Sequence, residues 1–75
     1  MRVELRSKLI ESALYDEDAR RLLIFFTNGE RREFEGVPQT VFEQLSSAKS
    51  PGQFYFDHIR HLYSSSISAG YDLRT

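Results

Sequence analysis

The stretch Arg20–Glu35, RRLLIFFTNGERREFE, decides the fold of this chain. Its first half is the most apolar run in the sequence, and its Ile and Phe residues favour strands. Asn28-Gly29 follows, and this dipeptide is a strong short-range signal for a hairpin. The stretch therefore predicts two antiparallel strands, one within 20–29 and one at 31–35, joined by a tight turn.

The length of that turn sets the register of the hairpin. A two-residue turn would place Phe34 opposite Leu23, whereas a three-residue turn with Gly29 in a left-handed bulge would place it opposite Leu22. A shift of one residue moves every side chain to the other face of the sheet. We prefer the bulged form because it gathers four large apolar side chains on one face, and Leu23 and Phe25 then point the other way. The four are Leu22, Ile24, Phe26 and Phe34.

Further elements are predicted on both sides of the hairpin. Before it, the polar segment 16–19 follows residues 9–15, which have strand character, so the three strands form a meander. After it, a first helix begins at Pro38, and apolar residues recur at or beside helical spacing from the residue before it. They are Val37, Val41, Phe42, Leu45 and Ala48.

A second helix is predicted from Pro51, with Ser50 as its N-cap and Gln53 in the position of a capping box. It should end near Tyr63, because three serines follow. Its apolar residues have the spacing of a helix that packs on a core. They are Tyr55, Ile59, Leu62 and Tyr63.

The predicted fold is α+β: a three-stranded antiparallel β-meander followed by two α-helices packed on one face. It occupies residues 9–63, after an N-terminal extension at 1–8. The C-terminal tail, 64–75, includes residues 68–72, four of which match the five residues at 12–16. Two interpretations of the tail stay open. The match is a coincidence, or the tail repeats the first strand and adds an extra strand to a sheet.

Composition restricts the class of protein. A chain of 75 residues forms one domain, and without cysteine it has no disulfide, thiol nucleophile or cysteine-based metal site. No apolar run approaches the ~20 residues of a membrane helix, and the N-terminus lacks the pattern of a signal peptide. We expect a cytoplasmic protein.

The chain has a net charge of −1, without the basic excess that is usual for nucleic-acid-binding proteins. Only a local basic patch would therefore serve that function.

Five short motifs occur in order along the chain. They are Tyr15-Asp16, Asn28-Gly29, Val37-Pro38 with Val41, Ser50-x-Gly52-x-Phe54-Tyr55, and Ile59-Arg60-x-x-Tyr63. In this order and spacing the chain resembles a KTSC domain, a small module named after the C-terminal region of some lysyl-tRNA synthetases. The resemblance implies a bacterial domain of uncharacterised role for which RNA binding is a suggestion.

The chain also departs from the family pattern. The third strand of the family typically carries a Tyr-x-Tyr pair, where this chain has Arg32 and Phe34. Phe56 stands where the family tends to have Asn. Leu23 and Phe25 occupy positions that are usually polar.

The favoured functional interpretation is a small non-catalytic binding module with RNA as its ligand. Six basic side chains would contact phosphates, with Phe54 or Tyr55 as a stacking platform. They are Arg31, Arg32, Lys49, His58, Arg60 and His61. The alternative is that both aromatic rings belong to the core and that the basic groups are simply solvated.

The rival interpretation is protein–protein association or self-association into a dimer. Leu14, Leu23 and Phe25 would form an apolar strip on the sheet face away from the helices, and such strips mark partner surfaces. Alternatively the tail covers this strip, or the extension at 1–8 pairs beside it through Val3 and Leu5.

Metal binding and catalysis are not predicted. His58 and His61 lie one helical turn apart beside Asp57, but zinc needs three or four ligands, and the chain has no cysteine and no third histidine. No motif brings together a nucleophile, a base and an orienting group. We therefore predict no enzyme, cofactor, metal or small-molecule substrate.

Overall fold

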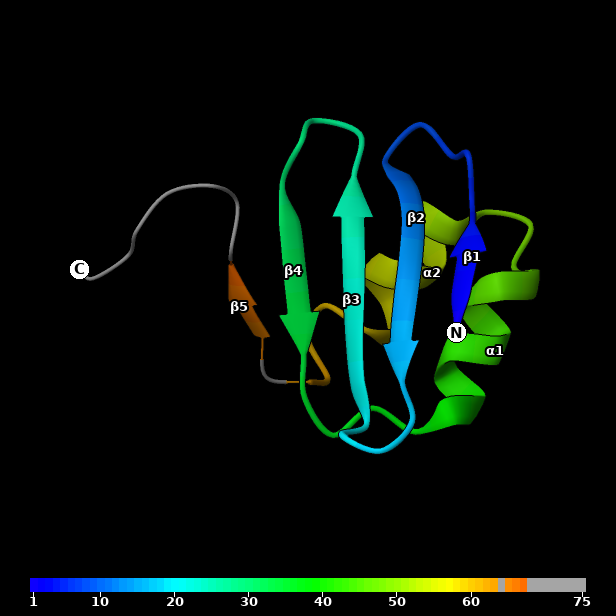
Figure 1. Ribbon diagram of the computed structural model, residues 1–75. Coiled ribbons are helices and arrows are strands. Elements are labelled where there is room, and N and C mark those ends of the chain that lie inside the picture. The colour runs from blue at the N-terminus through cyan, green and yellow to red at the C-terminus, as the bar shows by residue number, and fades with distance from the viewer. Residues whose placement is uncertain (64, 68–75) are drawn as a thin grey trace.

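The computed structural model describes residues 1–63 and 65–67 (Figure 1). Within them, five strands form one antiparallel sheet in the order β1-β2-β3-β4-β5, and two helices cover one of its faces. The elements are β1 (Arg2–Glu4), β2 (Ile10–Asp16), β3 (Arg21–Phe26), β4 (Arg31–Phe34), α1 (Gln39–Ser47), α2 (Pro51–His58) and β5 (Ser65–Ile67). The predicted α+β meander followed by two helices is confirmed, with an edge strand added on each side.

The central hairpin has the preferred bulged register. Phe34 lies opposite Leu22, and the backbone N–H of Phe26 donates to the carbonyl of Glu30 over 2.8 Å. Gly29 has a φ of +94°, a conformation that glycine adopts without the steric cost of a side chain. The turn therefore directs Phe34 towards the helices and Leu23 towards the opposite face.

Both edge strands come from the segments outside the predicted meander. In the 1–8 extension, β1 pairs with β2 so that Val3 lies opposite Ala13 and packs against the core. On the other edge, β5 pairs with β4 and places Ser65 opposite Phe34. The added strand in the tail thus precedes the repeated segment 68–72, which lies outside the described residues.

The core lies between the sheet and the two helices. The hydroxyl of Tyr15 donates to the carbonyl of Val37, and its ring stacks on Phe42 with the centroids 5.4 Å apart. Full burial of one large apolar side chain contributes about 1.5–3 kcal/mol. The buried apolar residues are Ile10, Ala13, Tyr15, Leu22, Ile24, Phe26, Phe34, Val37, Phe42, Leu45, Tyr55 and Ile59.

The ends of the helices differ from the prediction. Pro38 is the N-cap of α1 rather than its first helical residue. The predicted capping box of α2 is wrong, because Ser50 makes no side-chain capping bond and Gln53 Nε2 instead donates to Asp57 Oδ1 over 3.0 Å.

Helix α2 also ends earlier than predicted, with Ile59 as its C-cap. The N–H of Arg60 donates to the carbonyl of Tyr55, five residues back, so regular helical spacing stops there. Leu62 consequently is 64% exposed, and its predicted place in the core is wrong. No helix in the described part of the chain is long and apolar enough to cross a membrane.

Candidate functional site

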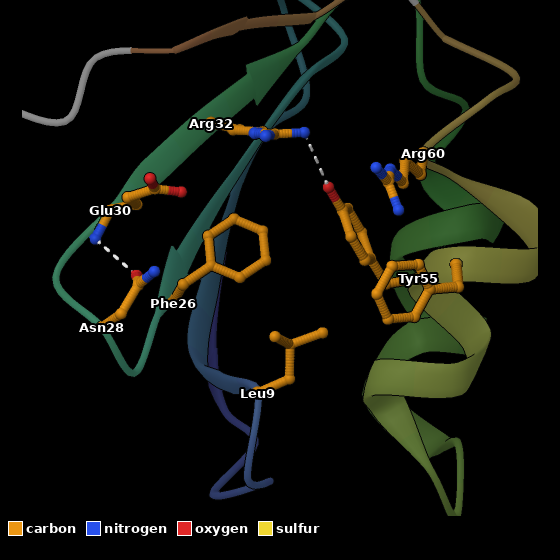
Figure 2. Close-up of a pocket in the computed structure, with 8 residues that line it drawn as sticks. Leu9, Phe26, Asn28, Glu30, Arg32, Tyr55 and Arg60 are labelled. Carbon is orange, nitrogen blue, oxygen red and sulfur yellow. Dashed lines mark hydrogen bonds between the residues drawn. The ribbon is translucent and has the colours of Figure 1, made fainter.

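A cleft of about 200 Å³ opens between the β3–β4 hairpin and helix α2 (Figure 2). This volume lies below the ~300–1,000 Å³ of most small-molecule pockets, so there is room for one flat ring system or a small polar group. Its lining combines apolar side chains, two arginines and a carboxylate. The lining residues are Leu9, Phe26, Asn28, Glu30, Arg32, Tyr55, Phe56 and Arg60.

Arg32 enters the cleft because of strand alternation. It lies opposite Ile24 on β3, two residues before Phe34, and so it shares the sheet face that the helices cover. Its Nη1 donates to the hydroxyl oxygen of Tyr55 over 3.3 Å (Figure 2), while its Nε is buried without a hydrogen-bond partner in residues 1–63 and 65–67. Among the described residues, no carboxylate makes an ion pair with Arg32. A partly buried charge without a counter-ion is unfavourable, so this site suits an anion.

Arg60 reaches the same cleft from the turn after α2. Its guanidinium lies over the ring of Phe56, with Cζ 5.2 Å from the ring centroid, in the geometry of a cation–π contact. Phe56 is 40% exposed and offers the cleft an accessible aromatic ring. Within the described residues Arg60, like Arg32, has no carboxylate partner.

The hairpin turn supplies the opposite side of the cleft. Asn28 Oδ1 accepts from the backbone N–H of Glu30 over 2.9 Å, so the amide nitrogen of Asn28 is left as a donor. Glu30 is partly buried, and its carboxylate offers acceptors only. With Arg32, Arg60 and Glu30, the lining carries a formal charge of +1.

Two of the six basic residues predicted to contact RNA line the cleft, namely Arg32 and Arg60. Arg31 is exposed and lies opposite Phe25, so it belongs to the other face of the sheet. Lys49 is exposed between the helices, where it borders a separate shallow hollow with Lys8.

The two histidines lie apart from the cleft lining. His58 is exposed on α2, and its ring packs against that of Phe54 with the centroids 4.8 Å apart. His61 is exposed in the following turn. Within residues 1–63 and 65–67, no three histidine, aspartate or glutamate side chains gather as a metal site would require.

The two rings predicted as a stacking platform are packed against the core. Tyr55 is only 3% exposed, and its ring meets Phe26 and Phe34 edge to face at 5.3 and 5.8 Å, so it belongs to the core. Phe54 is also packed against the core. The accessible ring beside the arginines is Phe56 instead.

Sequence reasoning also missed Asn28 and Glu30 as site residues. The turn signal accounts for Asn28 as a structural residue, and it gives no indication that the amide nitrogen of Asn28 is a donor in a site. Glu30 could have been found, because it lies opposite Phe26 just before β4 and so shares the side of Arg32 and Phe34, which the chosen register had already placed towards the core.

The predicted apolar strip lies on the open face of the sheet. Leu14 pairs with Leu23 across β2 and β3 and is 38% exposed. Phe25 is partly covered, because the guanidinium of Arg2 lies 5.6 Å from its ring centroid. Arg2 also donates to Ser12 Oγ over 3.3 Å, which helps to hold it there.

An exposed ion pair borders this strip. Arg21 contacts Glu35 at 3.0 Å and Glu33 at 3.7 Å. The hydrogen bond and the charge of Glu35 raise the pKa of Arg21 above its usual value. Surface pairs of this kind contribute little to stability, so their main effect is to make the border of the strip polar.

Comparisons with known proteins identify the relationship of this domain. The family model for the KTSC domain matches residues 6–63. Among solved structures, the chain is similar to the crystal structure of KTSC domain protein YPO2434 from Yersinia pestis, at 30% sequence identity and a TM-score of 0.83. That match covers 88% of this chain and 93% of the other. No curated protein matches the chain.

Proposed function

The chain belongs to the KTSC domain family, and on this premise we propose that it is a non-catalytic module that binds single-stranded RNA through the cleft beside α2. The observation that carries this proposal is the meeting of Arg32 and Arg60, both without a carboxylate partner among the described residues, beside the exposed ring of Phe56. Arginines contact phosphates, and accessible aromatic rings stack on unpaired bases.

The charge of the protein determines how strong such binding would be. With a net charge of −1, the protein as a whole does not attract a polyanion, so the affinity must come from the cleft itself. Two phosphate contacts on a single strand correspond to a slope of about −1.4 in log affinity against log salt. This slope is shallow compared with that of proteins that bind through extensive basic surfaces.

The test is a titration of a fluorescein-labelled single-stranded RNA of mixed sequence, followed by fluorescence anisotropy at several salt concentrations. Arg32→Gln and Arg60→Gln should each weaken binding about tenfold, because each removes a charge-assisted contact. Arg20→Gln is the matched control. It removes an exposed arginine from the β2–β3 turn, which lies at the opposite end of the sheet from the β3–β4 turn that lines the cleft (Figure 1).

Three results would contradict the proposal. They are undetectable RNA binding, an affinity that does not change with salt, and an equal loss of affinity in Arg20→Gln. The last result would mean that any exposed arginine serves and that the cleft has no special part.

Self-association is the second candidate, favoured by the exposed Leu14 beside Leu23 on the open sheet face. Light scattering at high protein concentration should then give the mass of a dimer, and Leu14→Ser should shift it towards the monomer. Leu62→Ser is the control, because Leu62 is exposed outside the strip. A monomer at every concentration would exclude this candidate.

A further inference from the structure

We propose that the cleft selects a guanine base, with the phosphate of the same nucleotide near Arg32 and Arg60 and the edge of the base against Asn28 and Glu30. This inference rests on the proposed function for the source of the nucleotide. It goes further by identifying which base the cleft takes. The hairpin turn supplies the groups that recognise it.

The cleft has two chemically different ends (Figure 2). Arg32 extends towards Tyr55 and Arg60 at one end, while Asn28 and Glu30 lie on the hairpin at the other. Glu30 and Arg32 are two residues apart along an extended chain, a separation of about 6.6 Å. A nucleotide has the same polarity, because its negative charge lies on the phosphate and its hydrogen-bonding edge lies on the base.

Glu30 determines which end takes the phosphate. Its carboxylate would repel a phosphate placed at the hairpin, whereas the two arginines would attract one at the opposite end. The hairpin end is therefore suited to a neutral group that carries N–H donors. Among the described residues Glu30 makes no ion pair, so its carboxylate is available to accept such donors.

The hydrogen bond between Asn28 and Glu30 determines which edge of a base would fit the hairpin. Because Asn28 Oδ1 already accepts from the N–H of Glu30, Asn28 presents a donor to the cleft, while Glu30 presents acceptors. The required base has one acceptor next to two adjacent N–H donors. Guanine has this edge, with O6 beside N1–H and the 2-amino group.

The other bases match less well. Adenine places a ring acceptor next to its amino group, and cytosine places two acceptors next to its own. Uracil has a single N–H between two carbonyl oxygens. Each of these bases would either place an acceptor against the Glu30 carboxylate or offer that carboxylate fewer N–H donors than guanine does. A site that hydrogen-bonds a specific N–H disfavours an analogue that lacks this N–H.

The size and the apolar walls of the cleft agree with one base. Leu9 and Phe26 line it with apolar surface, and its volume of about 200 Å³ leaves little space beyond one ring system, so the ribose and the phosphate would lie at its open side. Base stacking and apolar contact act on every base alike. They therefore contribute affinity, whereas Asn28 and Glu30 contribute selectivity.

The experiment uses three labelled RNA heptamers that differ only in the central base: guanine, hypoxanthine or uracil, with uracil at all other positions. The guanine heptamer should bind about tenfold more tightly than the hypoxanthine one, which lacks only the 2-amino group. Glu30→Gln should abolish most of this difference, because a carboxamide offers a single acceptor oxygen. Glu17→Gln, an exposed acid in the β2–β3 turn, is the control and should keep the preference.

A second titration distinguishes guanine selection from RNA binding. Guanosine monophosphate is added while the amide signals of the protein are followed by NMR. Equal binding of the three heptamers, or an unchanged preference in Glu30→Gln, overturns guanine selection and leaves RNA binding in place. If no heptamer binds but the mononucleotide shifts signals around the cleft, the result supports a nucleotide site and contradicts RNA binding. If neither ligand binds, both proposals are overturned.

Discussion

Replacing Arg32 by methionine should make the protein more stable while it abolishes most RNA binding. Methionine keeps an unbranched apolar stem in the space between β4 and α2 but carries no charge. In the wild type, Nε of Arg32 is buried and, among the described residues, has no hydrogen-bond partner, while the guanidinium makes a long hydrogen bond of 3.3 Å to the Tyr55 hydroxyl. The arginine therefore costs stability at this position.

The magnitude follows from two opposing contributions. Removing a buried unsatisfied N–H should recover about 1–3 kcal/mol. Losing the bond to Tyr55 should cost about 0.5–1.5 kcal/mol, at the lower end of this range because the bond is long and because the Tyr55 hydroxyl borders the open cleft, where water can replace the arginine. The free energy of unfolding should thus rise by about 1 kcal/mol, which raises Tm by about 4–8 °C in a domain of this size.

Urea unfolding followed by circular dichroism measures this change, and anisotropy with labelled RNA measures the loss of binding. Arg60→Met is the matched control, because Arg60 is exposed and its replacement should change stability by less than about 0.5 kcal/mol while it also weakens binding. A loss of stability of more than about 1 kcal/mol in Arg32→Met would refute the reasoning. Arg32 would then be a structural residue, and the trade of stability for binding would not exist here.

Three further substitutions test the fold around the cleft by urea unfolding. Gly29→Ala should lower the free energy of unfolding by about 1 kcal/mol, because φ is +94° there, while among the described residues no atom beyond the two chain neighbours lies within 4 Å of an added Cβ; an unchanged urea midpoint would contradict this argument. Phe34→Ala should lower the free energy of unfolding by about 3–5 kcal/mol, since Phe34 is fully buried. A loss below about 1 kcal/mol would mean that the core repacks to fill the cavity. Tyr55→Phe should cost about 0.5–1.5 kcal/mol and leave RNA affinity unchanged, because the ring is buried; a tenfold loss of affinity would show that its hydroxyl orients Arg32.

The core of the fold could be predicted because several local signals agree. The turn at Asn28-Gly29 and the four apolar side chains of the hairpin favour the same register, and the structure has it. The strand β1 could not be assigned in the same way. Residues 2–6 alternate between charged and apolar side chains, but a strand of three residues is too short for this alternation to identify it, and only pairing with β2 makes it a strand.

The end of α2 and the cleft depend on tertiary contacts that a sequence pattern does not contain. Helical spacing continues through Leu62, but the chain leaves the helix at Ile59, and no residue there signals the change. Because Arg60 lies just after this point, its meeting with Arg32 could not be derived from spacing. The exposure of Phe56 and the burial of Tyr55 likewise depend on how α2 is rotated against the sheet.

The register of the hairpin links the fold to the proposed site. With Gly29 in the bulge, residues 30, 32 and 34 lie on the side of the helices, so the strand that contributes Phe34 to the core also brings Glu30 and Arg32 to the cleft. With the alternative two-residue turn, Arg32 would lie opposite Phe25 on the open face of the sheet and would no longer line the cleft. One glycine with a positive φ therefore underlies both the packing of the sheet and the position of the charges proposed to bind a nucleotide.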